Sequence, residues 1–155
     1  MTKPRDADDV RQMVTDAANA GTPLEVVGRG TKRGLGRPIQ TGASLDLSGL
    51  SGIPLYEPDE LVMTALAGTP LGEVDAALKA QNQRLAFEPA DLGPLYGAPE
   101  SAASIGGVFA ANLSGSGRLR HGAARDHLLG LKAINGTGEF FKTGGRVVKN
   151  VTGYD

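Results

Sequence analysis

A glycine-rich segment near the N-terminus carries the first residues whose types suit ligand binding. It reads Gly28, Arg29, Gly30, Thr31, Lys32. Glycine lets the backbone adopt positive φ and approach a ligand closely. Successive main-chain N–H groups in such a turn form a concavity that suits phosphate oxygens. The Thr31 hydroxyl adds a donor, and Arg29 and Lys32 add positive charge. The segment predicts a phosphate-binding loop, with a plain flexible loop as the alternative.

Two common phosphate motifs do not fit this segment. A P-loop needs a Gly-Lys pair followed by Ser or Thr at the start of a helix, and the segment has no such pair. A dinucleotide fingerprint needs G-x-G-x-x-G running into a helix, whereas here the third glycine comes one position later, at Gly34. Gly36 and Pro38 then disfavour a helix. Asp46 stands where a ribose-binding acid would lie, but the helix that completes that motif is missing.

A second segment of small residues lies further along the chain and begins Ser104-Ile105-Gly106-Gly107. The Ser104 hydroxyl and the N–H groups after it stand where a helix is expected to begin, which is a favourable place for a pyrophosphate. Gly106 and Gly107 leave room for a large ligand against the backbone. A tight helix–sheet contact would explain the same residues, so packing and ligand binding are equal alternatives.

Basic side chains are unevenly distributed along the chain. Residues 26–45 contain four basic side chains and no acidic one, and residues 118–155 contain seven basic against three acidic. The whole chain nevertheless has 16 basic and 17 acidic side chains, a net charge of −1. This distribution favours an anionic ligand held by two parts of the chain and argues against nucleic-acid binding. Solvated charged faces would give the same pattern.

Composition excludes several other kinds of site. The 155 residues include no cysteine, so disulfides, thiolate metal sites and cysteine nucleophiles are excluded. No apolar run approaches the roughly 20 residues of a membrane span, and the polar N-terminus lacks the apolar centre of a signal peptide. We therefore expect a cytoplasmic protein without direct membrane insertion. No residues show metal-ligand spacing, and His121 and His127 lack a base-orienting partner, so neither is assigned a catalytic role.

The elements expected to position these segments are short. Apolar periodicity predicts a helix over residues 7–20, capped by Asp6. A second helix is expected to begin at Pro70 with Thr69 as its N-cap, and a third after Ser104. The expected strands are residues 24–27, 45–47, 53–57, 61–67, 85–87, 128–135 and 139–143. Helices interspersed among short strands favour an α+β fold.

Taken in order, these segments resemble the FAD-binding domain of PCMH-type flavoproteins, also called the vanillyl-alcohol oxidase type. The resemblance covers about residues 20–155. The residues that carry it are 27–31, which resemble the family's pyrophosphate loop, and 66–69, 104–107, Asn112, Ser114, Gly115, 125–131 and 148–155.

The resemblance implies an α+β, two-lobed FAD-binding domain of the PCMH type, truncated before a C-terminal substrate domain. The smaller lobe would cover about residues 1–88, and a larger, incomplete lobe with a mixed sheet about 89–155, with FAD between them. Covalent members of the family carry His where Thr31 stands, so non-covalent FAD is implied. The implied cofactor-binding residues are Gly28, Arg29, Gly30, Thr31, Lys32, Ser104, Ile105, Gly106, Gly107, Asn112, Ser114, Gly115, Val148 and Gly153.

Within the family, the Gly-Arg-Gly-Thr loop and residues 148–155 most resemble the FAD-binding subunit of bacterial glycolate oxidases. This implies a FAD-dependent oxidoreductase that acts on the CH–OH group of a small hydroxy acid, most simply glycolate to glyoxylate. A second flavoprotein subunit and an iron–sulfur subunit would be its partners, with association at the inner membrane through them left open. The fragment alone is expected to be inactive, and its catalytic residues are not identified. The alternative is a non-catalytic subunit that organises a redox complex.

Overall fold

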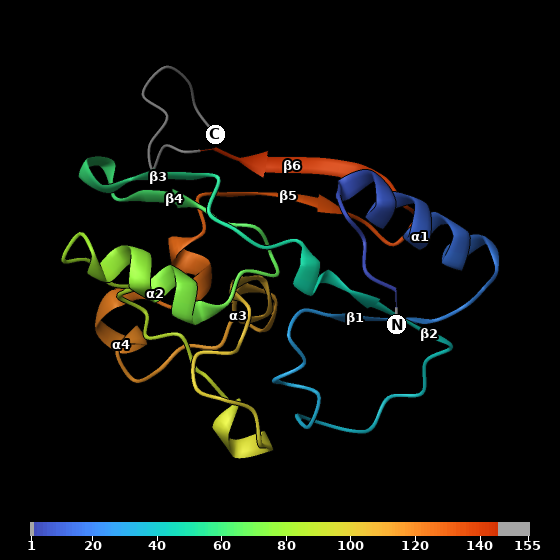
Figure 1. Cartoon of the computed structure of the whole chain (residues 1–155), viewed down its shortest axis with the longest axis horizontal. Helices are drawn as coiled ribbons and strands as arrows, with labels where there is room; N and C mark the ends of the chain where they lie inside the picture. The colour runs from blue at the N-terminus through green and yellow to red at the C-terminus, as the bar shows by residue number, and fades with distance from the viewer. Residues whose placement is uncertain (1, 146–155) are drawn as a thin grey trace.

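The computed structural model describes residues 2–145, whose helices and short strands are mixed along the chain (Figure 1). The helices are α1 Ala7–Asn19, α2 Leu71–Lys79, α3 Ile105–Ala111 and α4 Arg118–His121. The strands are β1 Leu24–Val27, β2 Ala43–Asp46, β3 Leu55–Glu57, β4 Val62–Thr64, β5 Gly130–Ile134 and β6 Phe140–Gly144. The α+β class expected from the sequence is confirmed.

Helix α1 forms where periodicity predicts it. The Asp6 side chain accepts a hydrogen bond from the Asp9 N–H at 2.9 Å and caps its start. The helix packs against the turn of the β5–β6 hairpin, beside which it lies in Figure 1. At that turn Gly138 has φ +85°, and a Cβ there would collide with the Thr15 hydroxyl. Only glycine permits this approach.

Strands β1 and β2 pair in parallel, with Val27 opposite Asp46. Strand β2 starts and ends earlier than the predicted strand 45–47, because Leu47 already belongs to a 3-10 helix, Leu47–Gly49. The Asp46 carboxylate caps that helix by accepting from the Ser48 N–H at 2.9 Å. The carboxyl ends of the two strands therefore share one edge, and the glycine-rich loop leaves β1 at that edge.

Two hairpins account for the other strands. Strands β3 and β4 pair antiparallel across the 3-10 helix Pro58–Glu60, which confirms the predicted strand pair with shorter bounds. Strands β5 and β6 confirm the predicted C-terminal hairpin. Residues 2–145 contain three two-stranded sheets, so the larger mixed sheet expected in the second lobe is not formed by this part of the chain.

Two local predictions are wrong. Thr69 does not cap α2, because its hydroxyl donates to the Leu66 carbonyl at 2.7 Å and accepts from the Gly52 N–H at 3.0 Å. Pro70 takes the N-cap position instead. Residues 85–87 form no strand. They belong to a turn that places the Phe87 side chain in the core. Tertiary contacts thus override the local propensity at both places.

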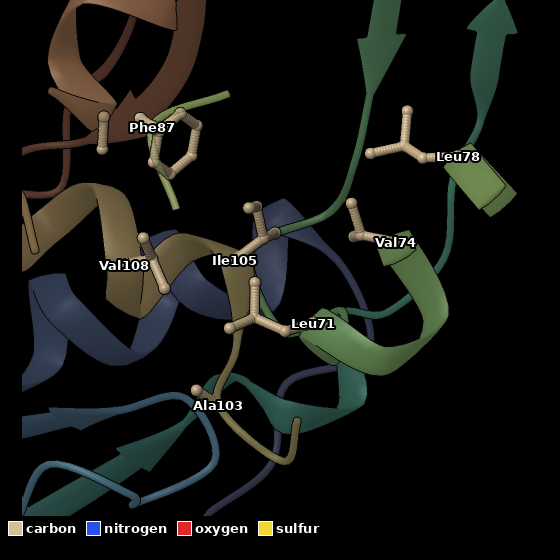
Figure 2. Close-up of a cluster of buried hydrophobic side chains, with 8 residues drawn as sticks. Leu71, Val74, Leu78, Phe87, Ala103, Ile105 and Val108 are labelled. Atoms are coloured by element: carbon tan, nitrogen blue, oxygen red, sulfur yellow. The ribbon is translucent and has the colours of Figure 1, made fainter. Parts of the chain in front are cut away.

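The hydrophobic core lies between α2 and α3, as Figure 2 shows. Leu71, Val74 and Leu78 of α2 point toward Ile105 and Val108 of α3. Phe87, Ala103 and Ala124 complete the cluster, each with no exposed surface. The core thus contains residues from before and after residue 88, the predicted boundary between the lobes. The division into two lobes stays a prediction.

We predict that Gly68→Ala destabilises the fold by about 3 kcal/mol. A Cβ at Gly68 would collide with the Leu47 carbonyl and lie 2.8 Å from that of Leu50, so main chain rather than a flexible side chain would have to move. Thermal or urea unfolding measures the loss. Gly136→Ala is the matched control, because a Cβ there meets nothing within 4 Å. Equal stability of the two variants would contradict the prediction.

Candidate functional site

The loop of residues 28–32, which we call the first loop, presents hydrogen-bond donors that no other described residue uses. Within residues 2–145, none of its main-chain N–H groups donates to a protein acceptor. Thr31 is only 5 % exposed, and its hydroxyl makes no hydrogen bond with another described residue. Gly30, with φ +72°, bends the backbone around these donors.

The first loop meets residues 104–107, which we call the second segment, although they are far apart in sequence. A side chain at Gly28 would collide with the Ser104 hydroxyl and lie 3.1 Å from the Ser104 Cβ. The Lys32 ammonium lies 3.7 Å from the position that a Gly107 Cβ would take. The two glycine-rich segments are therefore neighbours in the fold, which is the arrangement that a shared phosphate ligand requires.

Within the second segment, only part of the backbone faces the first loop. The Ile105 N–H donates to the Thr69 carbonyl at 2.9 Å, and the Gly106 N–H donates to the Ala67 carbonyl at 3.0 Å. A Cβ at Gly106 would lie 2.7 Å from the same Ala67 oxygen, so this glycine serves close packing. Ser104 caps α3 by accepting from the Gly107 N–H at 3.3 Å. Ser104 and Gly107 are thus the members in contact with the first loop.

Asn112, Ser114 and Gly115 lie beyond the other end of α3, a helix of seven residues that spans roughly 10 Å. The side-chain oxygen of Asn112 accepts a hydrogen bond from the Arg125 N–H at 3.0 Å, and the Ser114 hydroxyl accepts one from the Ala124 N–H at 2.8 Å. Their side chains therefore hold the 3-10 helix Ala124–His127 in place. The other two predicted site residues, Val148 and Gly153, lie outside the described residues.

An open cleft of about 580 Å³ lies beside the first loop, at the carboxyl ends of β1 and β2. Carboxyl ends of parallel strands are a common place for ligands in α/β sheets. Sequence reasoning missed Lys3, Arg33, Ser48 and Gly49, because nothing in the sequence showed that β1 and β2 pair in parallel. The lining residues are Lys3, Val27, Gly28, Arg29, Gly30, Arg33, Asp46, Ser48 and Gly49.

The one carboxylate in the lining of this cleft, that of Asp46, already has partners. It accepts from the Ser48 N–H and pairs with the Lys3 ammonium at 3.4 Å. Burial acts to raise the pKa of Asp46, but the hydrogen bonds from Ser48 and the contact with Lys3 outweigh it and hold that pKa below its ordinary value. Asp46 is thus an anionic helix cap, in agreement with the rejection of a ribose-binding role.

Lys32 is a partly desolvated cation. Burial lowers the pKa of its ammonium from the ordinary value of 10.5, and the charge of Asp91 opposes that shift only in part. No carboxylate of the described residues lies within 4 Å of this ammonium. A desolvated cation without a close counter-ion gains most from an anionic ligand, so Lys32 adds a positive charge beside the N–H donors of the first loop.

The His127 side chain has structural partners. The His127 ring packs 5.2 Å from that of Phe87, and its Nε2 shares a hydrogen bond with the His121 carbonyl at 2.8 Å. Across residues 2–145, no group of His, Cys, Asp and Glu side chains is arranged to hold a metal ion. In the same range, no helix has both the length and the hydropathy needed to cross a bilayer.

Comparison with known proteins finds close relatives of this chain. A family model described as an FAD binding domain matches residues 1–144. Glycolate oxidase subunit GlcE of Escherichia coli is 43% identical over 144 residues, which is 93% of this chain and 39% of that protein. Glycolate oxidase subunit GlcD of Bacillus subtilis is 28% identical over 98% of this chain and 31% of its own length. The chain thus spans well under half of these relatives.

The fold also occurs among solved structures. The crystal structure of Phl p 4, a grass pollen allergen with glucose dehydrogenase activity, superposes with a TM-score of 0.72 and 18% sequence identity. The match covers 91% of this chain and 28% of that one.

Proposed function

This chain belongs to the FAD-binding domain family that matches residues 1–144, and from that premise we propose that it is the FAD-binding part of a flavin-dependent 2-hydroxy-acid oxidoreductase subunit. Its relatives among the glycolate oxidase subunits favour glycolate as the substrate and glyoxylate as the product. The substrate, the activity and the partner subunits belong to the whole protein, of which this chain is the cofactor-binding domain.

The observation that carries the proposal is the meeting of the first loop with the second segment. N–H donors that no other described residue uses, the Thr31 hydroxyl and the Lys32 ammonium belong to the first loop, which meets the second segment where Gly28 approaches Ser104. Hydrogen-bond donors together with a desolvated cation suit the two negative charges of a diphosphate. Because Gly28 and Gly107 have no side chains, a diphosphate can approach the backbone there. The residues present therefore fit the diphosphate bridge of FAD.

Each part of the site has a distinct role in this proposal. The N–H groups of residues 28–32 donate to the phosphate oxygens, and Lys32 balances their charge. Arg29, at the edge of the loop, adds to the positive potential. FAD supplies the redox chemistry, while the protein binds, orients and electrostatically tunes it. Asn112, Ser114 and Gly115 are proposed to lie along the ribityl chain or ring, and Val148 and Gly153 to meet the adenine.

Thr31 bears on the mode of FAD attachment. A threonine hydroxyl does not form the flavin–imidazole bond of covalent members, so we propose non-covalent FAD at this loop. The whole protein is proposed to act with a second flavoprotein subunit and an iron–sulfur subunit. Those partners would bring a cytoplasmic protein to the inner membrane.

The test is the cofactor content of the purified chain. We expect a yellow protein, or one that turns yellow with added FAD, whose flavin passes into the supernatant after acid denaturation. A folded but colourless chain that takes up no FAD would instead support the non-catalytic structural subunit. Dye reduction with glycolate is a separate measurement, and we expect none from this chain alone because it spans only 39% of its Escherichia coli glycolate oxidase relative. Turnover by the isolated chain would refute that expectation.

The lowered pKa of Lys32 predicts a pH dependence of FAD affinity. The charged ammonium binds the diphosphate, so affinity is complete below the pKa of the free site and declines as pH rises through it. Because burial lowers this pKa, the decline begins below the ordinary lysine value of 10.5. Titration of FAD fluorescence quenching from pH 7 to 10 measures it. Lys32→Met should bind about tenfold more weakly at pH 7 and lose this dependence. An unchanged pH profile in the variant would exclude Lys32 as its source.

A further inference from the structure

A buried carboxylate and an arginine join the two sides of the first loop. Glu25 lies on β1 and is only 8% exposed. Both of its carboxylate oxygens accept from the Arg33 guanidinium, from Nε and from Nη2, at 2.8 Å each. The Ser44 hydroxyl, on the neighbouring strand β2, donates to the same carboxylate at 3.1 Å. Bidentate pairing of this kind fixes orientation as well as charge.

The Glu25–Arg33 pair encloses the first loop, because residues 28–32 lie between its two members in the sequence. The Arg33 N–H also donates to the Gly30 carbonyl at 3.2 Å. The Arg33 side chain folds back along the loop, with its Cδ 3.6 Å from where a Gly30 Cβ would be. The start of the loop is held by β1, and its end is held to β1 and β2 through one carboxylate.

We propose that Glu25 and Arg33 are positioning residues that hold the first loop in its FAD-binding shape before the cofactor arrives. The inference rests on the proposed function of that loop. A glycine-rich loop has much backbone entropy to lose on binding, and a contact that orders it beforehand lowers that cost. Arg33 acts through the loop rather than on the diphosphate, because its charge is already matched by Glu25.

The effect of Glu25→Gln on FAD affinity has opposite signs if the pair positions the loop and if Arg33 acts on the diphosphate directly. If Arg33 acted only as a charge near the diphosphate, removing the Glu25 charge would free that charge and tighten FAD binding. If the pair holds the loop, the same substitution breaks the bidentate contact and weakens FAD binding, by about tenfold. Titration calorimetry with FAD measures the dissociation constant. Tighter or unchanged binding by the folded variant would overturn the proposal.

Four further variants complete the binding test. Arg33→Gln should weaken binding as Glu25→Gln does, and the double variant should be no worse than either, because the pair acts as one unit. Arg33→Lys keeps the charge without the bidentate geometry and should fall between. Arg37→Gln, an exposed cation of the same region without an ion pair to any described residue, is the matched control and should bind FAD normally. Additive losses in the double variant would contradict the proposal.

A readout without FAD keeps failure of the inference distinct from failure of the proposed function. Trypsin sites lie in and beside the loop at Arg29, Lys32 and Arg33, and Glu25→Gln leaves all of them intact. We expect faster cleavage there in the variant at unchanged melting temperature. If Glu25→Gln does not fold, Ser44→Ala, which removes only the third contact, takes its place. Equal cleavage rates would overturn the inference, whereas absence of FAD binding by the parent would overturn the proposed function.

Discussion

Replacing Gly107 by valine is expected to abolish FAD binding in a chain that still folds. A Cβ at this position would lie 3.0 Å from the Ser104 hydroxyl and 3.7 Å from the Lys32 ammonium. The valine methyl groups extend further, into the space where the first loop and the second segment meet. They would displace Lys32 and occupy the approach to the loop N–H groups. We expect the FAD dissociation constant to rise at least about a hundredfold, measured by calorimetry or flavin fluorescence.

Two comparisons make this result interpretable. Gly107→Ala should give a smaller loss, because the Ser104 hydroxyl can rotate away from a single methyl group. Gly136→Val is the matched control, since the hairpin turn offers open space around Gly136. Circular dichroism and the melting temperature report whether each variant folds. Normal FAD affinity in folded Gly107→Val would remove the second segment from the cofactor site.

Phe87→Ala is expected to cause the largest loss of stability, about 3–5 kcal/mol. The ring is completely buried and packs 5.7 Å from that of Phe109 and 5.2 Å from that of His127. It therefore ties the turn after α2 both to α3 and to the 3-10 helix Ala124–His127. Removing it leaves a cavity that these elements cannot easily fill. Chemical denaturation of the purified chain measures the change in unfolding free energy.

Phe140→Ala is the control for the stability prediction. The Phe140 ring is 54% exposed on β6, so its loss should change the unfolding free energy by no more than about 0.5 kcal/mol. A comparable cost for the two substitutions would mean that Phe87 is not the centre of the core. Phe87→Ala should also weaken FAD binding at temperatures where the variant is still folded, because α3 carries Ser104 and Gly107.

Local signals predicted the parts of the fold that local chemistry decides. Helix α1 has its Asp6 cap and a glycine just beyond its end, and the β5–β6 hairpin has a glycine-containing turn between two apolar stretches. The prediction failed at Thr69 and Phe87. The Thr69 hydroxyl bonds to the main chain of Leu66 and of the distant Gly52, and the Phe87 ring is buried in the core. A hydroxyl that could cap a helix instead forms hydrogen bonds with other main-chain groups when buried groups of that kind lie within reach.

The candidate site shows the same division. The residue types of the first loop and of the second segment predicted donors and open backbone, and the sequence pattern identified their family. It did not show that Ile105 and Gly106 already donate to the residues before α2, or that Asn112 and Ser114 hold another turn. It also gave no sign of the Glu25–Arg33 pair, since a glutamate in a short strand is ordinarily solvated.

The sequence by itself predicted a phosphate-bearing ligand and, through its family resemblance, FAD, because glycine, hydroxyl and lysine chemistry is a property of the residues and of their order along the chain. Only the tertiary structure decided which of those groups are available. Strand β1 pairs in parallel with β2, and α3 packs against the residues before α2, so Gly28 reaches Ser104 and Lys32 reaches Gly107. Each of these contacts joins residues distant in the chain, so their geometry depends on tertiary packing rather than on any local preference.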